Sequence, residues 1–329
     1  MPALESGEET LVGGQAVIEG VMMRAPHSYC VAVRQPSGEI LTSEMPAPRM
    51  SELYRIYKLP VFRGVGTLYQ AMSLGMRALK FSANAALAGE AAGAKSAAES
   101  GQKSQKSKPE PKAKAKELSN WALTLNLLFS LGFFIFLYKF VPLVLVTRLQ
   151  KVVPALEGRF AFNLADGLIR LAIFLCFLFV ISRMKDIRRV FEYHGAEHRV
   201  VFNFESGQPV TTANAQKFVT WHPRCGTSFL LVVMVVSILV YTLVPFEGFW
   251  AKLAARVVLL PVIAGLSYEL IRFAARRRGS LLATLTAPGL WLQRVTTKTP
   301  SDCQTEVAIC ALERAMQLEK AQGGELVIA

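Results

Sequence analysis

The chain has 329 residues, of which 52% are hydrophobic and only 19% are charged, so it is more apolar than most soluble proteins. Its formal net charge of +13 is compatible with a nucleic acid or an anionic membrane surface as partner. Because the basic residues crowd around the ends of apolar runs, we expect a membrane protein whose basic loops contact anionic lipid head groups, and no specific nucleic-acid partner.

Residues 1–60 are expected to form a small cytoplasmic unit. The first ten residues are acidic and have no apolar core, so the sequence predicts no secretory signal peptide. Residues 30–42 read as two short strands that are joined by a turn at residues 36–38, where Pro, Ser and Gly follow one another.

Two contrasting segments follow this unit. In residues 61–90, apolar residues recur at helical spacing with Arg77 and Lys80 between them, which predicts an amphipathic helix. This helix would lie on the inner leaflet, pack on the spans, or belong to the soluble unit. Residues 91–118 are rich in Ala, Ser, Lys, Gly and Gln and predict a flexible basic linker, because they cannot bury enough apolar surface to fold.

Four apolar runs are long enough to cross a bilayer, which requires about 20 mostly apolar residues. Buried helices of a large soluble protein are the alternative, but the third run is too long and too uniformly apolar for that. The runs cover residues 121–146, 164–181, 227–245 and 253–271. The resulting divisions are transmembrane helices 1 and 2 (119–182), a middle loop (183–225), transmembrane helices 3 and 4 (226–272) and a tail (273–329).

The sequence therefore predicts a mainly α fold, a polytopic membrane protein with about four transmembrane helices plus a small β-containing N-terminal unit. Basic residues predict its orientation: six lysines precede the first span, seven basic residues lie in the middle loop, and four arginines follow the fourth span. The other two loops carry fewer. The positive-inside rule then places both termini and the middle loop in the cytoplasm.

The tail is expected to contain a helix that docks on the other cytoplasmic parts. Thr299 would cap its N-terminus, Pro300 suits the first turn, and Asp302 lies three residues after the cap. Five cysteines are scattered along the chain without the spacing of a disulfide framework, so we expect free thiols or metal ligands.

The middle loop contains FEYHGAEHR at residues 191–199, with two of the four histidines of the chain. If this segment is helical, His194 and His198 differ by about 40° around the axis and Glu197 lies about 60° to the other side of His194. Two imidazoles at this spacing suit a zinc-like ion, and a neighbouring carboxylate suits proton transfer. The order His-x-x-Glu-His is that of the inverzincin metallopeptidases. Gly195 weakens a helix, which suggests a close approach by another segment.

A second segment, WHPRCGTS at residues 221–228, adds His222 and Cys225 directly before the third span. Spans that are joined by one loop are expected to be neighbours, which would bring the two segments together. Glu269 is a further candidate, because an ionisable residue in a span usually has a function. The alternatives are three polar residues on a solvated helix at 194–198, an interfacial His222, and a Cys225 that only fills apolar space.

Three motifs in this order resemble the YqhQ family of bacterial membrane proteins, which carry a domain of unknown function and are described as predicted metal-dependent enzymes. The motifs are GGQAVIEGVMMR (13–24), HGAEH (194–198) and HPRCGTS (222–228). The resemblance runs from about residue 12 to 320 and implies a protein of the bacterial cytoplasmic membrane. It marks as site residues His194, Glu197, His198, His222 and Cys225. In the first motif, Glu19 and Arg24 would line a site or pair with each other.

Two functions compete. The first is a metal-dependent integral membrane enzyme, hydrolytic in type, in which a divalent transition metal, zinc by preference, is held by His194 and His198 together with one or two of His222, Cys225 and Glu269. Glu197 would then be the general base. The second is a membrane scaffold or assembly factor in which the metal only holds the middle loop together. Four protein ligands close a metal site, whereas three leave a position for water. A transporter is less favoured, because the spans carry few polar residues and show no inverted repeat.

Overall fold

The computed structural model describes residues 12–100, 120–223, 225–276 and 287–322. Its N-terminal unit is a four-stranded antiparallel sheet with the strands in chain order. The strands are β1 (Gly13–Val17), β2 (Gly20–Arg24), β3 (Ser28–Arg34) and β4 (Ile40–Pro46). The hairpin that was predicted within residues 30–42 is confirmed as β3 and β4, and the turn contains Gly38 at φ +90°. The first two strands were not predicted.

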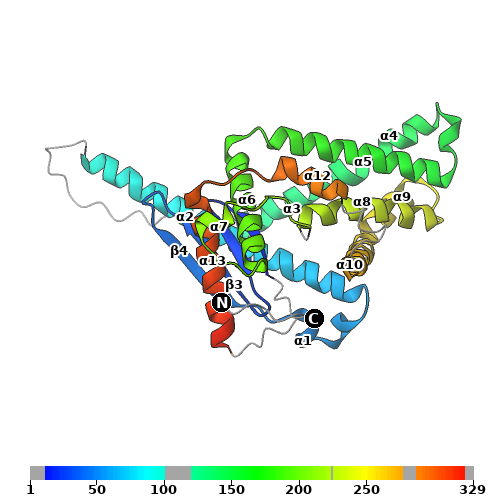
Figure 1. Ribbon diagram of the computed structural model, residues 1–329. Coiled ribbons are helices and arrows are strands. Elements are labelled where there is room, and N and C mark those ends of the chain that lie inside the picture. The colour runs from blue at the N-terminus through cyan, green and yellow to red at the C-terminus, as the bar shows by residue number, and fades with distance from the viewer. Residues whose placement is uncertain (1–11, 101–119, 224, 277–286, 323–329) are drawn as a thin grey trace.

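Helices cover both faces of this sheet (Figure 1). On one face, Met22 and Val31 pack with Leu74 of α2 (Phe62–Ser100). On the other face, Met23 and Cys30 pack against α6 (Lys185–Glu205) and α13 (Asp302–Ala321). Neighbouring residues of one strand therefore pack into two different hydrophobic cores, one on each face of the sheet. This burial on both sides explains why β2 and β3 read as continuous apolar runs instead of alternating patterns.

The predicted amphipathic helix at residues 61–90 is longer than expected, because α2 continues to Ser100. The first ten residues of the expected linker, 91–100, are therefore helical, in keeping with the high helix propensity of their alanines. Residues 101–118 of that linker lie outside the described residues. Besides packing on the sheet, α2 contacts α10 (Leu260–Arg276), where Gly64 lies against Tyr268.

Among the described residues, three helical stretches are long and apolar enough to cross a membrane, or four if one bent pair counts as a span. The three are Thr124–Gln150, Arg159–Ile181 and Gly226–Leu243. They agree with the first three predicted runs and with association with a membrane. Most of their large apolar side chains face outward, and Phe129 and Leu243 are 74% and 80% exposed.

The bundle contains the following further elements: α3 (Asn120–Ile135), the π-helical turn η2 (Phe136–Phe140), α4 (Val141–Gln150), η3 (Pro154–Leu156), α5 (Arg159–Ile181), α8 (Gly226–Leu243), α9 (Phe249–Val258) and α12 (Ala287–Thr296). The prediction of one continuous helix for the fourth run, residues 253–271, is wrong. The segment bends by 50° between α9 and α10. Pro261 lies in the first turn of α10, where its ring and missing N–H prevent a continuous helix.

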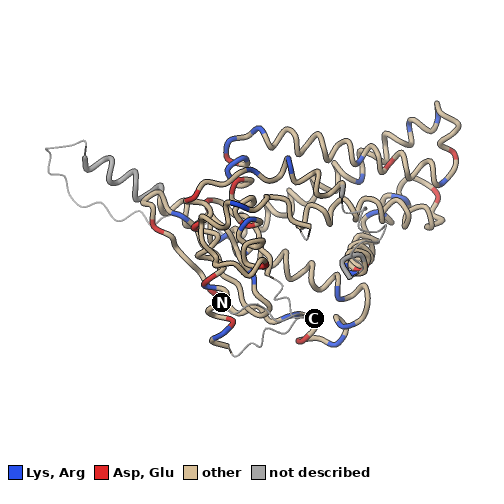
Figure 2. The backbone as a smooth tube through the Cα atoms, viewed as in Figure 1, with Lys and Arg blue, Asp and Glu red and all other residues tan. Residues whose placement is uncertain are grey.

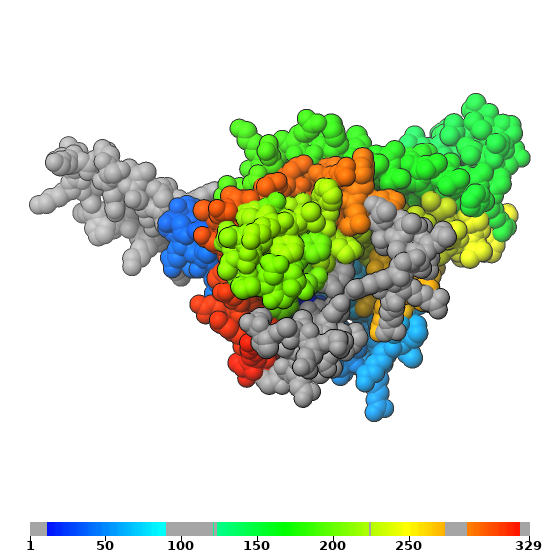
Figure 3. All heavy atoms as spheres, in the orientation of Figure 1, coloured from blue at the N-terminus to red at the C-terminus, as the bar shows by residue number. Residues whose placement is uncertain are grey.

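The expected middle loop, residues 183–225, is mostly helical. It contains α6 and the short α7 (Thr212–Ala215), and its yellow-green part lies between the orange and the red segments in Figure 3. Lysines and arginines gather at the corner between α5 and α6, whereas most of α5 lacks them (Figure 2). The N-terminal unit is completed by α1 (Met50–Leu53) and the 3₁₀ turn η1 (Arg55–Lys58).

The tail helix docks on the sheet and on α6, as predicted. Its start differs from the prediction: Ser301 is the N-cap instead of Thr299, and Pro300 precedes the cap. The side chain of Ser301 accepts from the backbone N–H of Gln304, and the Gln304 side chain accepts from the backbone N–H of Ser301. A capping box requires a Glu or Gln side chain at the third position after the cap. Gln304 stands at this position relative to Ser301, which explains why the helix is capped two residues later than predicted.

Candidate metal centre

Helix α6 brings His194 and His198 onto one face, with 4.4 Å between the ring centroids. The Nδ1 atom of His194 lies 2.8 Å from the backbone carbonyl of Thr296, and Nδ1 of His198 bonds the carbonyl of Thr220. A carbonyl oxygen can only accept, so both Nδ1 atoms carry the proton. In the neutral imidazole each Nε2 atom then has a lone pair that could bind a metal ion, which is the arrangement that second-shell carbonyls impose on histidine ligands.

The thiol of Cys225 completes a cluster with these two imidazoles. Cys225 is the N-cap residue of α8, and its Sγ lies 3.3 Å from Nε2 of His194. One ligand atom each from His194, His198 and Cys225 lies within 4.8 Å of the others. A tetrahedral ion with bonds of about 2.0–2.3 Å has ligand atoms about 3.3–3.7 Å apart. The separation between Cys225 and His194 lies in this range, and the 4.8 Å limit for the whole set requires a shift of about 1 Å at most to hold a zinc-like ion.

Glu197 lies beside both imidazoles and is only 6% exposed. Its Oε2 atom is 3.5 Å from Nε2 of His198 and 4.0 Å from Nε2 of His194. Strand β1 packs against the side-chain stem of Glu197, since a Cβ atom on Gly14 would lie 2.6 Å from Cγ of Glu197. Only glycine fits here, so the first sequence motif forms a wall of the site.

Gly195 provides a second close approach, as its place in the motif suggested. A Cβ atom at this position would lie 1.9 Å from the backbone carbonyl oxygen of Lys298. The N–H of Lys298 donates to the carbonyl of Phe191 at 2.8 Å, so the chain after α12 runs directly along α6. This contact brings the Thr296 carbonyl to His194, and it explains why a helix-weakening glycine stands between the two histidines.

Comparison with known proteins identifies the family. Residues 59–318 match the family described as "Protein of unknown function (DUF1385)", which covers most of the chain. The chain belongs to the DUF1385 family. The "Uncharacterized protein YqhQ" of Bacillus subtilis (strain 168) is 33% identical over 310 residues, or 93% of this chain and 92% of the relative. The resemblance that was inferred from three motifs is thereby confirmed. No solved structure matches the chain.

In this DUF1385 protein, His222 lies next to the cluster. Its ring is 5.7 Å from that of His198 and 4.5 Å from Phe202, and its Nε2 is 3.5 Å from a carboxylate oxygen of Glu205. Burial lowers the pKa of the His222 imidazole, an effect that the charge of Glu197 partly opposes. His222 is therefore a neighbour of the three converging ligands whose charged form is disfavoured by burial, and its proposed role as a ligand stays a prediction.

The turn that carries His222 and Cys225 is held by Gln293 of α12, a residue that the sequence analysis missed. The backbone N–H of His222 donates to the Gln293 side chain at 2.7 Å, and Gln293 donates back to the His222 carbonyl at 2.8 Å. Gln293 also donates to the Ser228 hydroxyl at 3.1 Å and is fully buried. An uncharged polar residue directly after the apolar residues LWL (290–292) was the available signal.

Glu269, the remaining predicted ligand, lies elsewhere in this DUF1385 chain. Its carboxylate accepts from the side chain of Arg63 and from the backbone N–H of Val61, so it joins α10 to the start of α2. The geometry therefore gives Glu269 a structural contact instead of a place in the converging cluster. A carboxylate near the end of a span is stabilised by a neighbouring cation. The sequence did not reveal that Arg63 would lie next to Glu269.

The two charged residues of the first motif do not pair with each other. The carboxylate of Glu19 accepts from the guanidinium of Arg189 and lies 3.4 Å from the Tyr193 hydroxyl, which ties the β1–β2 turn to α6. Arg24 donates to the side chain of Gln70 on α2 at 2.8 Å. Both residues therefore hold helices against the sheet, and burial together with the Glu19 charge raises the pKa of Tyr193 to about 12.

Proposed function

We propose that this protein is a metal-dependent membrane enzyme of hydrolytic type. The observation that carries the proposal is the convergence of three ligand atoms, from His194, His198 and Cys225, with the carboxylate of Glu197 beside both imidazoles. A divalent ion such as zinc, when bound, supplies a Lewis acid and lowers the pKa of water. Three protein ligands are the number that leaves a position open for chemistry.

Within this proposal, Glu197 acts as the general base that takes a proton from the attacking water. Strand β1 restricts its side chain through the contact at Gly14, so the carboxylate stays close to the ligand atoms. The His194 side chain is 17% exposed and Cys225 is half-buried, which leaves the cluster accessible from that side. Glu197, at 8% side-chain exposure, is the more enclosed partner, as suits a base that must work without competing solvent.

A scaffold with a structural metal is the second candidate. The observation in its favour is the origin of the ligands, because α6 packs on the sheet whereas Cys225 begins an apolar helix of the bundle. An ion at this position would tie the soluble unit to the spans. The distances from Glu197 to the two imidazoles would also suit a fourth ligand, and four protein ligands would close the site.

We also propose that the metal centre and both termini face the cytoplasm of a bacterial cell. The sheet, α6 and α13 pack together, so they lie on one side of the membrane. The chain that leaves this side in α3–α4 returns in α5, and the chain that leaves in α8 has to return through the bent pair α9–α10. The basic residues around α6 support a cytoplasmic location for this side, where anionic lipid head groups would meet them.

Reporter fusions test this topology. A fusion after Ala155, in the connection between α4 and α5, should be active only as an extracytoplasmic reporter such as alkaline phosphatase. A fusion after Val210, in the connection between α6 and α7, should be active only as a cytoplasmic reporter such as a fluorescent protein. The same side for both positions would contradict four crossings.

Substitution of the bound ion by Co²⁺ tests whether the site is open. A thiolate-to-cobalt charge-transfer band is expected, and it should disappear in Cys225→Ser, because that change removes the only sulfur ligand in the cluster. Added azide should alter the visible d–d bands of the wild-type protein if a coordination position is free. Visible bands that azide leaves unchanged would show a closed site and would favour the scaffold.

A further inference from the structure

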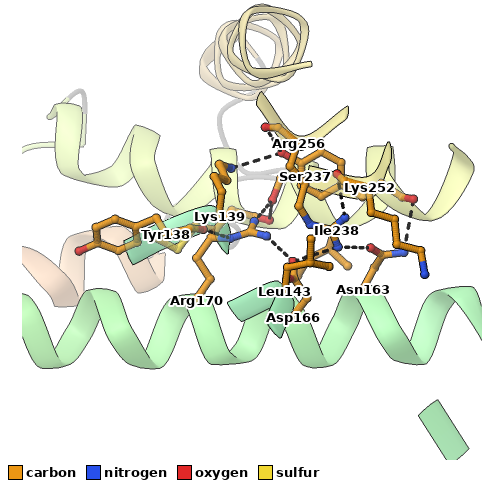
Figure 4. Close-up of polar contacts among 12 residues, drawn as sticks. Tyr138, Lys139, Leu143, Asn163, Asp166, Arg170, Ser237, Ile238, Lys252 and Arg256 are labelled. Carbon is orange, nitrogen blue, oxygen red and sulfur yellow. Dashed lines mark hydrogen bonds and ion pairs between the residues drawn. The ribbon is translucent and has the colours of Figure 1, made fainter. Parts of the chain in front are cut away.

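A second group of charges lies inside the helix bundle, away from the metal centre (Figure 4). Lys139 of η2, Asp166 and Arg170 of α5 and Arg256 of α9 are between 1% and 9% exposed. Three of these side chains are basic and one is a carboxylate. Charged groups are costly at such positions and usually mark a functional site in a membrane-spanning bundle.

The contacts of these residues leave an excess of positive charge. Asp166 accepts from the guanidinium of Arg170 and lies 3.4 Å from that of Arg256. Lys139 has a neutral partner in the Tyr241 hydroxyl at 3.3 Å. The Nε atom of Arg256 and the Oδ1 atom of Asp166 are both buried without a hydrogen-bond partner. One carboxylate therefore serves two guanidinium groups among the described residues of this cluster, and Arg256 and Asp166 each keep one unused hydrogen-bonding atom.

A cavity of about 330 Å³ lies directly against this cluster. Its lining includes the buried Arg256, Asn163 and Tyr241, and also Lys252 and Arg159. The two carboxylates of its lining, Glu157 and Glu247, are exposed, as is Arg159, and Lys252 is half-buried. The buried part of the wall contains the cationic Arg256 and the hydrogen-bonding Asn163 and Tyr241. The volume is at the lower end of the range for small-ligand sites.

The cavity lies at the end of the bundle opposite the metal centre. It is formed at the start of α5 and the end of α8, whereas the metal ligands follow the end of α5 and precede the start of α8. The 18 residues of α8 span about 27 Å, close to the thickness of a bilayer core. The cavity is therefore a separate site, independent of the proposed enzymatic function.

We propose that this cavity binds the phosphate group of an anionic phospholipid. Guanidinium forks are suited to phosphate oxygens, and Lys252 and Arg159 add charge where the helices end, at the depth of head groups. Phe246, which also lines the cavity, is 52% exposed, and the nearby Trp250 is 73% exposed. Such aromatic side chains are typical of the membrane interface, and they favour a lipid over a free phosphate ion as the source of the phosphate.

The experiment uses the purified full chain in detergent, with lipid binding followed by native mass spectrometry. Phosphatidylglycerol should bind more tightly than phosphatidylcholine, and the double variant Arg159→Gln/Lys252→Gln should bind it about tenfold more weakly, because two charged donors are lost. Lys151→Gln is the matched control, since this exposed lysine lies between α4 and α5 but does not line the cavity. Arg256→Lys, which keeps a charge beside Asp166, should weaken binding further.

Phosphatidylglycerol binding that is unchanged in the double variant and in Arg256→Lys would overturn the proposal. A thermal-unfolding series with inorganic phosphate distinguishes the two sources of phosphate. Stabilisation by inorganic phosphate that depends on Arg159 and Lys252, without any preference for phosphatidylglycerol, would assign the cavity to a soluble phosphate compound and would refute a lipid. Unfolding temperatures that match the wild type would show that the variants remain folded.

Discussion

Glu197→Gln should leave the metal ion bound and the fold intact while it lowers activity by about 10²–10⁴-fold, the usual effect of losing a general base. Glutamine keeps the volume of glutamate and the contact with Gly14, and one oxygen acceptor remains. It cannot take a proton from water. The measurement is complementation of a strain that lacks the gene, at native expression, together with the metal content of the purified variant.

Glu192→Gln is the matched control for this experiment, because Glu192 lies on the same helix and contacts Arg188 and Gln304 instead of the cluster. It should complement fully. If Glu197→Gln also complements fully, the carboxylate has no catalytic role and the scaffold with a structural metal becomes the better proposal. If Glu197→Gln loses the ion, the carboxylate is a ligand, and the site is closed by four protein groups.

His198→Ala and Cys225→Ala should each reduce the bound metal from about one ion per chain to less than about a tenth, since a three-ligand set cannot hold its ion tightly after losing a member. His198 is 2% exposed, so its removal also leaves a cavity between α6 and the Thr220 segment. Elemental analysis of the purified proteins measures the loss. Cys303→Ala changes an exposed thiol outside the cluster and should keep the full metal content. Undiminished metal in both ligand variants would refute the centre.

The local part of the candidate site was predictable from the sequence. A helix of period 3.6 places His194, Glu197 and His198 in one sector, and the structure keeps them there because α6 is regular from Lys185 to Glu205. The approach of Cys225 followed from the expectation that spans joined by one segment are neighbours. Glu269 was assigned to the site from its position in a span alone, and that position did not reveal its partner Arg63.

The differences between the predicted and the observed fold also arise from contacts and breaks that a local reading of the sequence does not register. Strand β2 lacks the alternation that indicates a strand, since helices bury both of its faces. Strand β1 is short, begins with two glycines and is mostly exposed or half-buried, so its residues carry little strand signal. The fourth apolar run has the composition of one span, and a hydropathy window does not register the break that Pro261 imposes. The expected linker at residues 91–100 has the composition of a disordered segment, yet it extends α2, whose ordered part is anchored on the sheet.

The sequence by itself determined the apolar helices, the basic segments between them, and the sector that presents two imidazoles and a carboxylate, because hydropathy and helical period are local properties. Only the tertiary structure decided what encloses that sector. Gly14 lies against Glu197 from 183 positions away, Lys298 crosses Gly195, and Gln293 holds the turn of His222. Such contacts depend on how the sheet, α6 and α12 pack in three dimensions, which no short window of sequence specifies.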